Sequence, residues 1–224
     1  MKRVGLLVVL VLGASFAATA GPFAVGPHLG YTFGGDVEES SAVVGAQCTY
    51  ALDEQWSLEL AVSQYTEETK ETERWDGGAG GAIWITDYDL IPIALSLVYT
   101  HAPGDGVALY AGGGVALYLV DIEGSAEPLA GSATTSASLD IEADSGYGVQ
   151  GMLGCAYDAS QAIEAAGAGS VALSLFADLR LAWAVYDYEA TYAGVDAGSP
   201  WLESEDDTSD YVHAMVRVGA GITF

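Results

Sequence analysis

The most restrictive feature of this chain is a period-two alternation of side-chain character that runs from about residue 22 to the C-terminus. Period two is the repeat of a β-strand, in which successive side chains point to opposite faces. Loop-type sequence interrupts the alternation and divides it into segments, and we read each segment as one strand. The eight predicted strands are approximately 22–33, 41–51, 56–66, 88–101, 107–121, 146–157, 171–188 and 210–224.

In each predicted strand one phase is markedly more apolar than the other. In 171–188, for example, Leu175, Leu179 and Trp183 share one phase, whereas Asp178 and Arg180 fall in the other. A soluble β-sandwich also alternates, but its apolar phase forms the core. Here the second phase is mostly Gly, Ala, Ser, Thr and Gln with a few charges, which suits a narrow lumen surrounded by a lipid-facing wall.

The connections between the predicted strands alternate in length. The connections of one side fall at 52–55, 102–106 and 158–170. The third is long for this class, and 160–166 within it could hold a helical turn. The other four connections are about 34–40, 67–87, 122–145 and 189–209, and three of these are much longer. Short periplasmic turns that alternate with long extracellular loops are typical of outer-membrane barrels.

Aromatic residues mark the strand ends next to the short connections. All of them fall in the apolar phase, as a girdle at lipid headgroup level requires. They are Phe23, Tyr50, Trp56, Tyr99, Tyr157 and Phe224. Alternation, loop lengths and aromatic placement together predict an all-β fold, an eight-stranded antiparallel up-and-down transmembrane β-barrel.

The first twenty residues have the pattern of a secretory signal peptide. A basic start that includes Lys2 and Arg3 precedes an apolar run at 4–16 and the small-x-small site 18–20, so cleavage is expected before Gly21. The alternative, an uncleaved anchor, is disfavoured because the run is shorter than the ~20 apolar residues that span a bilayer. We therefore expect residues 1–20 to be removed and 21–224 to form the barrel.

With these features, the chain resembles the small outer-membrane barrels of the OmpA/OmpX type. The resemblance rests on the signal peptide, four hairpins and the last strand, VRVGAGITF at 216–224. It implies a monomer in the bacterial outer membrane, surrounded by outer-membrane lipid, with extracellular loops and periplasmic termini. It also implies that the barrel-assembly machinery recognises the last strand through Phe224.

Four ionic residues fall in the phase assigned to the lumen: Glu59, Asp178, Arg180 and Arg217. Charges inside a membrane protein are costly unless they are paired. We therefore expect a lumenal ion cluster, which is either a plug or the gate of a small pore. Polar residues of the same phase should surround it: His28, Gln47, Gln150 and His213.

The chain is strongly acidic, with 31 Asp and Glu against 6 Lys and Arg and a formal charge of -25. This balance argues against nucleic acid as a partner. Most of the carboxylates lie in or beside the four longer connections, where a solvated surface explains them. The alternative is a weak Ca²⁺ or Mg²⁺ site on the loops, with Glu203, Glu205, Asp206 and Asp207 as candidate ligands. No other cofactor is expected.

Other reactive residues give weaker signals. Cys48 and Cys155 fall on strands four apart among eight, so we expect free thiols on opposite walls. Some small outer-membrane barrels modify lipid A, but Ser209 and His213 lack an evident third residue to orient them. The favoured function is therefore a non-enzymatic surface barrel with a structural or adhesive role. The alternatives are a narrow pore for small apolar or cationic solutes and a lipid A-modifying enzyme.

Overall fold

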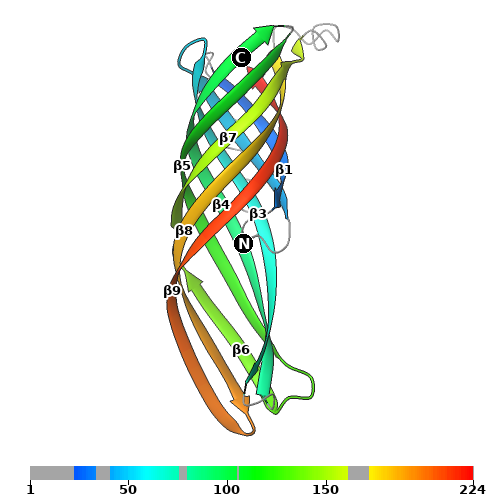
Figure 1. Ribbon diagram of the computed structural model, residues 1–224, viewed down its shortest axis with the longest axis vertical. Coiled ribbons are helices and arrows are strands. Elements are labelled where there is room, and N and C mark those ends of the chain that lie inside the picture. The colour runs from blue at the N-terminus through cyan, green and yellow to red at the C-terminus, as the bar shows by residue number, and fades with distance from the viewer. Residues whose placement is uncertain (1–22, 34–40, 76–79, 105, 161–171, 224) are drawn as a thin grey trace.

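The computed structural model describes residues 23–33, 41–75, 80–104, 106–160 and 172–223, with the backbone alone for 66–75. It contains nine antiparallel β-strands in one sheet (Figure 1). Their bounds are β1 Phe23–Phe33, β2 Ala42–Ala51, β3 Trp56–Trp75, β4 Gly80–Gly104, β5 Val107–Pro128, β6 Thr134–Ala143, β7 Gly146–Asp158, β8 Ala172–Asp196 and β9 Ser199–Thr223. No helix in this described part is long and apolar enough to cross a membrane.

Eight of the strands close into a ring. The order is β1-β2-β3-β4-β5-β7-β8-β9, and β9 pairs with β1 to complete it. Apart from the closing pair of β9 with β1, neighbours in the ring follow one another along the chain. The strand β6 comes between β5 and β7 in the sequence but pairs with β8 outside the ring. The structure therefore confirms the predicted eight-stranded, antiparallel, up-and-down barrel.

Strands β3, β4, β5, β8 and β9 continue well beyond the ring, which ends near the last pairs of β1 with β9. In Figure 1 these extensions and β6 form the lower part of the molecule, and the short turns lie at the other end. We call the extensions together with β6 the upper sheet, although they point downward in Figure 1. The end of the molecule that they form is the long-hairpin end, and the opposite end is the short-turn end.

The predicted loops are the main correction to the sequence analysis. Residues 67–75 and 80–87 belong to the β3–β4 hairpin, 122–128 and 134–143 are strand, and 189–196 and 199–209 form the β8–β9 hairpin. The segment 122–145 also contains β6, a ninth strand that was not predicted. The connection 34–40, residues 1–20 and Phe224 lie outside the described residues.

The outer wall of the ring is an exposed apolar belt. Leu29, Tyr147 and Leu153 are 62%, 68% and 64% exposed. On β8 the belt runs from Leu175 to Val185, about 33 Å of strand, and a barrel tilt turns this into about 25 Å of height. That height matches the hydrocarbon-facing band of a membrane barrel.

The polarity of the wall reverses where β8 leaves the belt. Within the belt Leu179, Leu181 and Trp183 are exposed on the outside. Beyond it, the outward positions carry Asp187 and Glu189, and Ala190 is completely buried on the inside. Along β8 the upper sheet is therefore polar outside and apolar inside, the opposite of the ring.

The turn after β7 is stabilised by a carboxylate. Asp158 accepts hydrogen bonds from the backbone N–H of Ser160, at 2.9 Å, and from its hydroxyl. These bonds hold the pKa of Asp158 below its ordinary value. Of the helical turn expected at 160–166, only residue 160 is described.

Candidate functional site: a closed lumen and an acidic upper sheet

The four predicted ionic residues meet in the middle of the ring. Asp178 and Arg217 are directly paired across β8 and β9. Arg217 donates to both carboxylate oxygens of Asp178, at 2.9 Å from Nε and 2.7 Å from Nη2. Arg180 Nη2 lies 2.5 Å from Glu59 Oε1 and Arg180 Nε lies 3.3 Å from Asp178 Oδ1. We call these four residues the ion cluster.

The ion cluster is almost completely removed from water. Arg217 is 0% exposed and the other three members are 5% exposed or less. Two neutral side chains complete its hydrogen bonds: Gln47 Oε1 accepts from Arg217 at 3.1 Å, and the Tyr110 hydroxyl donates to Asp178 at 3.1 Å. Two acids and two bases in mutual contact leave the cluster without net charge, and this compensation makes its burial tolerable.

The other predicted lumenal residues lie around the ion cluster in separate hydrogen bonds. His28 Nε2 and Ser63 Oγ are 2.9 Å apart, and Gln150 donates to Ser96 at 2.8 Å. His213 lies further toward the long-hairpin end. It makes a long contact of 3.4 Å with the Tyr65 hydroxyl.

A second layer closes the lumen beyond the ion cluster. Tyr65, Leu90, Tyr118 and Met215 pack in one buried cluster and are 4% exposed or less. We call these four residues the apolar plug. A cavity of about 20 Å³ lies between the two layers, which is little more than the space of one water molecule. On the short-turn side of the ion cluster a larger space of about 170 Å³ reaches Gly26, Ser57 and Tyr110.

Several of these lumenal residues were not identified from the sequence. Ser63, Tyr65, Ser96, Tyr110 and Tyr118 all occupy the inward phase of predicted strands. Strand parity was the signal that could have found them. Tyr110 falls in that phase but was not among the polar residues expected around Asp178.

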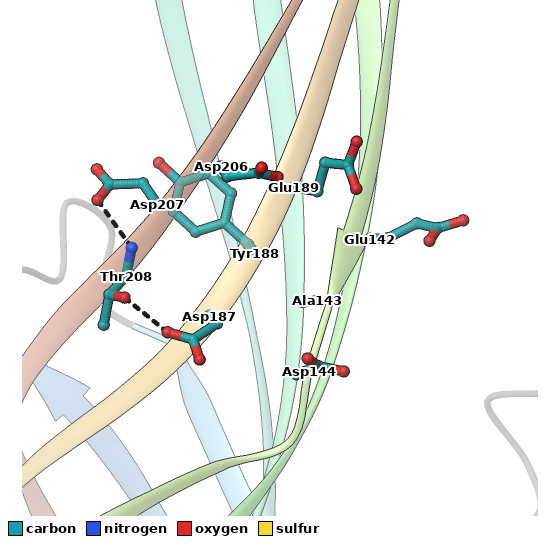
Figure 2. Close-up of a pocket in the computed structure, with 9 residues that line it drawn as sticks. All are labelled: Glu142, Ala143, Asp144, Asp187, Tyr188, Glu189, Asp206, Asp207 and Thr208. Atoms are coloured by element: carbon teal, nitrogen blue, oxygen red, sulfur yellow. Dashed lines mark hydrogen bonds between the residues drawn. The ribbon is translucent and has the colours of Figure 1, made fainter.

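On the outside of the upper sheet, carboxylates form rows across three strands. Glu142 on β6 is directly opposite Glu189 on β8, which is opposite Asp206 on β9. Two residues before Glu189 on β8, Asp187 lies beside Asp144 and accepts a hydrogen bond from the Thr208 hydroxyl. Figure 2 shows these side chains and that of Asp207 around a surface hollow of about 580 Å³. We call the six carboxylates the acidic face.

The four candidate cation ligands do not converge. Glu203 and Glu205 pair with Tyr192 and Ala190, so they share the inner face of the upper sheet. Asp206 and Asp207 instead both line the surface hollow of Figure 2. Among the described residues no group of three or more His, Cys, Asp or Glu could hold a metal ion. Strand alternation separates the ligands that adjacency in the sequence suggested.

The predicted aromatic girdle lies on the outer wall at the short-turn end. Phe23 and Tyr50 are paired with ring centroids 4.8 Å apart, and Trp56 and Tyr99 with centroids 5.1 Å apart. Tyr157 is also exposed there. At the opposite edge of the belt, Tyr31, Tyr147 and Trp183 are exposed as well, a second ring of aromatics that was not predicted.

The reactive side chains lie apart from one another. Cys48 on β2 and Cys155 on β7 are free thiols, as expected, and their strands stand four apart in the ring. Ser209 and His213 share a face of β9, but four residues of strand place them about 13 Å apart. That separation is too large for a hydrogen bond between nucleophile and base.

Comparison with known proteins identifies the fold. Neither a protein-family model nor a curated protein sequence matches the chain. The crystal structure of Neisserial surface protein A is similar, with a TM-score of 0.54 and 13% identity, covering 92% of this chain and 99% of that chain. The outer-membrane protein OprG from Pseudomonas aeruginosa gives a TM-score of 0.46 with 14% identity, covering 92% and 96%.

The attachment invasion locus protein Ail of Yersinia pestis also matches, at a TM-score of 0.44 and 12% identity, covering 90% of this chain and 96% of that chain. The similarity to Neisserial surface protein A extends over almost the whole of both chains. The chain therefore has the fold of a small eight-stranded outer-membrane β-barrel.

Proposed function

We propose that this chain is a non-enzymatic protein of the bacterial outer membrane that does not conduct solutes and acts through its upper sheet. The observation that carries the proposal is the double closure of the lumen. The ion cluster and the apolar plug follow one another along the barrel axis, and only about 20 Å³ of space lies between them. A pore for small solutes would need both layers to move.

The upper sheet supplies the surface for a structural or adhesive role. It extends beyond the apolar belt, and its outside carries the acidic face. With the girdle of the short-turn end at one headgroup level and Tyr31, Tyr147 and Trp183 at the other, the acidic face would stand in water outside the cell. An acidic surface disfavours anionic partners and favours cationic ones.

Conductance across a planar bilayer tests this proposal. We expect purified protein to give no steady single-channel current in potassium chloride, because a lumen filled by side chains leaves no water path. The double variant with Tyr118→Ala and Arg217→Ala removes one member of each layer. It is the control with an opened lumen and should conduct. Steady channels in the unmodified protein would overturn the proposal, and the pore would then be the correct function.

A further inference from the structure

The upper sheet encloses a second interior space, separated from the ion cluster by the apolar plug. This cavity has a volume of about 180 Å³. Five aromatic residues line it: Trp84, Tyr88, Tyr186, Tyr188 and Tyr192. Trp84 and Tyr192 meet edge to face with centroids 5.1 Å apart, and Trp84 and Tyr186 are each 6% exposed. We call this space the aromatic cavity.

The aromatic cavity has carboxylates near its edge and no basic side chain among its lining residues. Arg180 of β8 and Arg217 of β9 belong to the ion cluster, beyond the apolar plug. Glu203 and Glu205 of β9 share a face with Tyr192 and Ala190, which line the cavity. The sequence has no Lys or Arg at 75–179 or 181–216, the stretches that supply every lining residue. The electrostatic potential there is therefore negative, and the cavity favours a cation over a neutral or anionic ligand.

The chemistry of the walls restricts which cation fits. A metal ion needs several oxygen ligands to replace its water. The described residues offer no group of three or more that could supply them. Aromatic faces instead attract a cation whose charge is spread over an alkyl surface, as in the aromatic cages that recognise quaternary ammonium groups.

The size and access of the cavity agree with a small organic cation. An apolar cavity of about 150 Å³ can hold benzene, so a volume of about 180 Å³ suits one trimethylammonium headgroup. Within the described residues, positions 199–213 of β9 pair with β8 alone. The strand that carries Glu203 and Glu205 is thus an open edge of the upper sheet, through which a ligand can enter.

We propose that the aromatic cavity binds a small quaternary ammonium ligand through its aromatic side chains, with Glu203 and Glu205 attracting the positive charge. The site is distinct from the ion cluster, and the proposal does not depend on the lumen being closed. Choline is the probe that represents this chemistry. Its neutral isostere 3,3-dimethylbutanol has the same shape without the charge.

The experiment is a calorimetric titration of the purified protein in a maltoside detergent, which itself carries no quaternary ammonium. We expect choline to bind in the millimolar range or tighter, and the neutral isostere to bind about tenfold more weakly, since a desolvated cation–π contact is worth that factor. Sodium chloride at equal ionic strength is the reference for non-specific screening. Equal binding of the two probes, or no choline binding, would overturn the proposal.

Two matched pairs of variants locate the site. Glu205→Gln should weaken choline binding about threefold, the effect of one nearby surface charge. Asp206→Asn changes the adjacent residue on the opposite face and should leave binding unchanged. Tyr192→Leu should weaken binding about fivefold while Tyr192→Phe retains it, because the ring and not the hydroxyl faces the cation. Equal losses within either pair would show that choline binds elsewhere.

Discussion

The ring and the upper sheet carry their charges in opposite ways. In the ring, two carboxylates and two guanidinium groups lie within 4 Å of one another and out of water. In the upper sheet, Glu142, Glu189 and Asp206 lie in one row on the water-facing side, and residues 181–216 contain no Lys or Arg to oppose them. A buried charge requires a partner, whereas a solvated one does not.

The contribution of a charged side chain to stability therefore depends on whether water solvates it. The ion cluster holds the interior of the ring together at one height. The carboxylates of the acidic face are exposed and contribute little to stability. The largest energetic effects are therefore expected in the ring, and the effects of functional interest in the upper sheet.

The strongest test of the comparison is removal of one base from the ion cluster. Arg217→Ala leaves Asp178 without its main partner in a site that water does not reach. We expect the free energy of unfolding to fall by about 3–5 kcal/mol, the usual consequence of breaking a buried ion pair. Urea-induced unfolding of the folded barrel, followed by heat-dependent gel mobility, measures it.

Two further variants show whether the charge is responsible. Val218→Ala truncates a lipid-facing side chain in the same strand and should cost much less. Arg217→Ala combined with Asp178→Asn restores neutrality, so it should destabilise less than the sum of its single changes. A loss in Arg217→Ala no larger than in Val218→Ala would show that the ion cluster does not stabilise the ring.

A smaller effect separates the tight interior of the ring from the upper sheet. Gly114 and Gly124 both face inward on β5. A methyl group at Gly114 would meet backbone atoms of β4, 2.0 Å from Leu95 O and 2.6 Å from Ser96 Cα. At Gly124 the nearest atoms belong to β6: Leu139 Cγ at 2.6 Å and Leu139 O at 3.0 Å. β6 is paired with β8 and can move away from β5 more easily.

We therefore expect Gly114→Ala to lower the free energy of unfolding by about 2–3 kcal/mol, as overpacking does. Gly124→Ala should cost about 1 kcal/mol or less, because a side chain can change rotamer where a hydrogen-bonded strand cannot shift. Gly151→Ala is the control, since its nearest neighbour would be at 4.0 Å. Equal losses at Gly114 and Gly124 would show that the upper sheet is packed as rigidly as the ring.

Strand parity explains how much of this molecule could be predicted from its sequence. In the ring, alternation of apolar and small residues identified the lumenal phase, and that phase placed Asp178 and Arg217 at matching heights on neighbouring strands. Strand pairing is local and antiparallel there, so the chain order also gives the order of the ring.

The upper sheet could not be predicted in the same way, because its alternation is inverted. Residues 139–143 alternate Leu, Ile and Ala with Asp and Glu, but here the apolar phase faces inward and the charged phase faces water. Where every strand is expected to have apolar residues on its outside, a segment with charges on that side is interpreted as a loop. Packing among distant aromatics such as Trp84 and Tyr192 stabilises it, and strand periodicity alone does not reveal that contact.

The smallest expected effect concerns the row of like charges on the acidic face. Glu189 lies directly between Glu142 and Asp206, and carboxylates opposite one another in a sheet repel. Glu189→Gln keeps the shape of the side chain and its contact with the Ser204 hydroxyl, at 3.3 Å, while it removes the central charge. We expect the barrel to become more stable by about 0.5 kcal/mol at low salt, with no gain in ~1 M salt because screening has already removed the repulsion.

The matched control is Glu127→Gln, the same change at an exposed position of β5 that lies opposite Ile83. It should leave the urea midpoint unchanged at both salt concentrations. Destabilisation by Glu189→Gln would mean that a cation bridges the row and stabilises it, so that the acidic face would resemble the ion cluster in requiring a partner. A gain that disappears with salt would instead show that these carboxylates are tolerated only because water surrounds them.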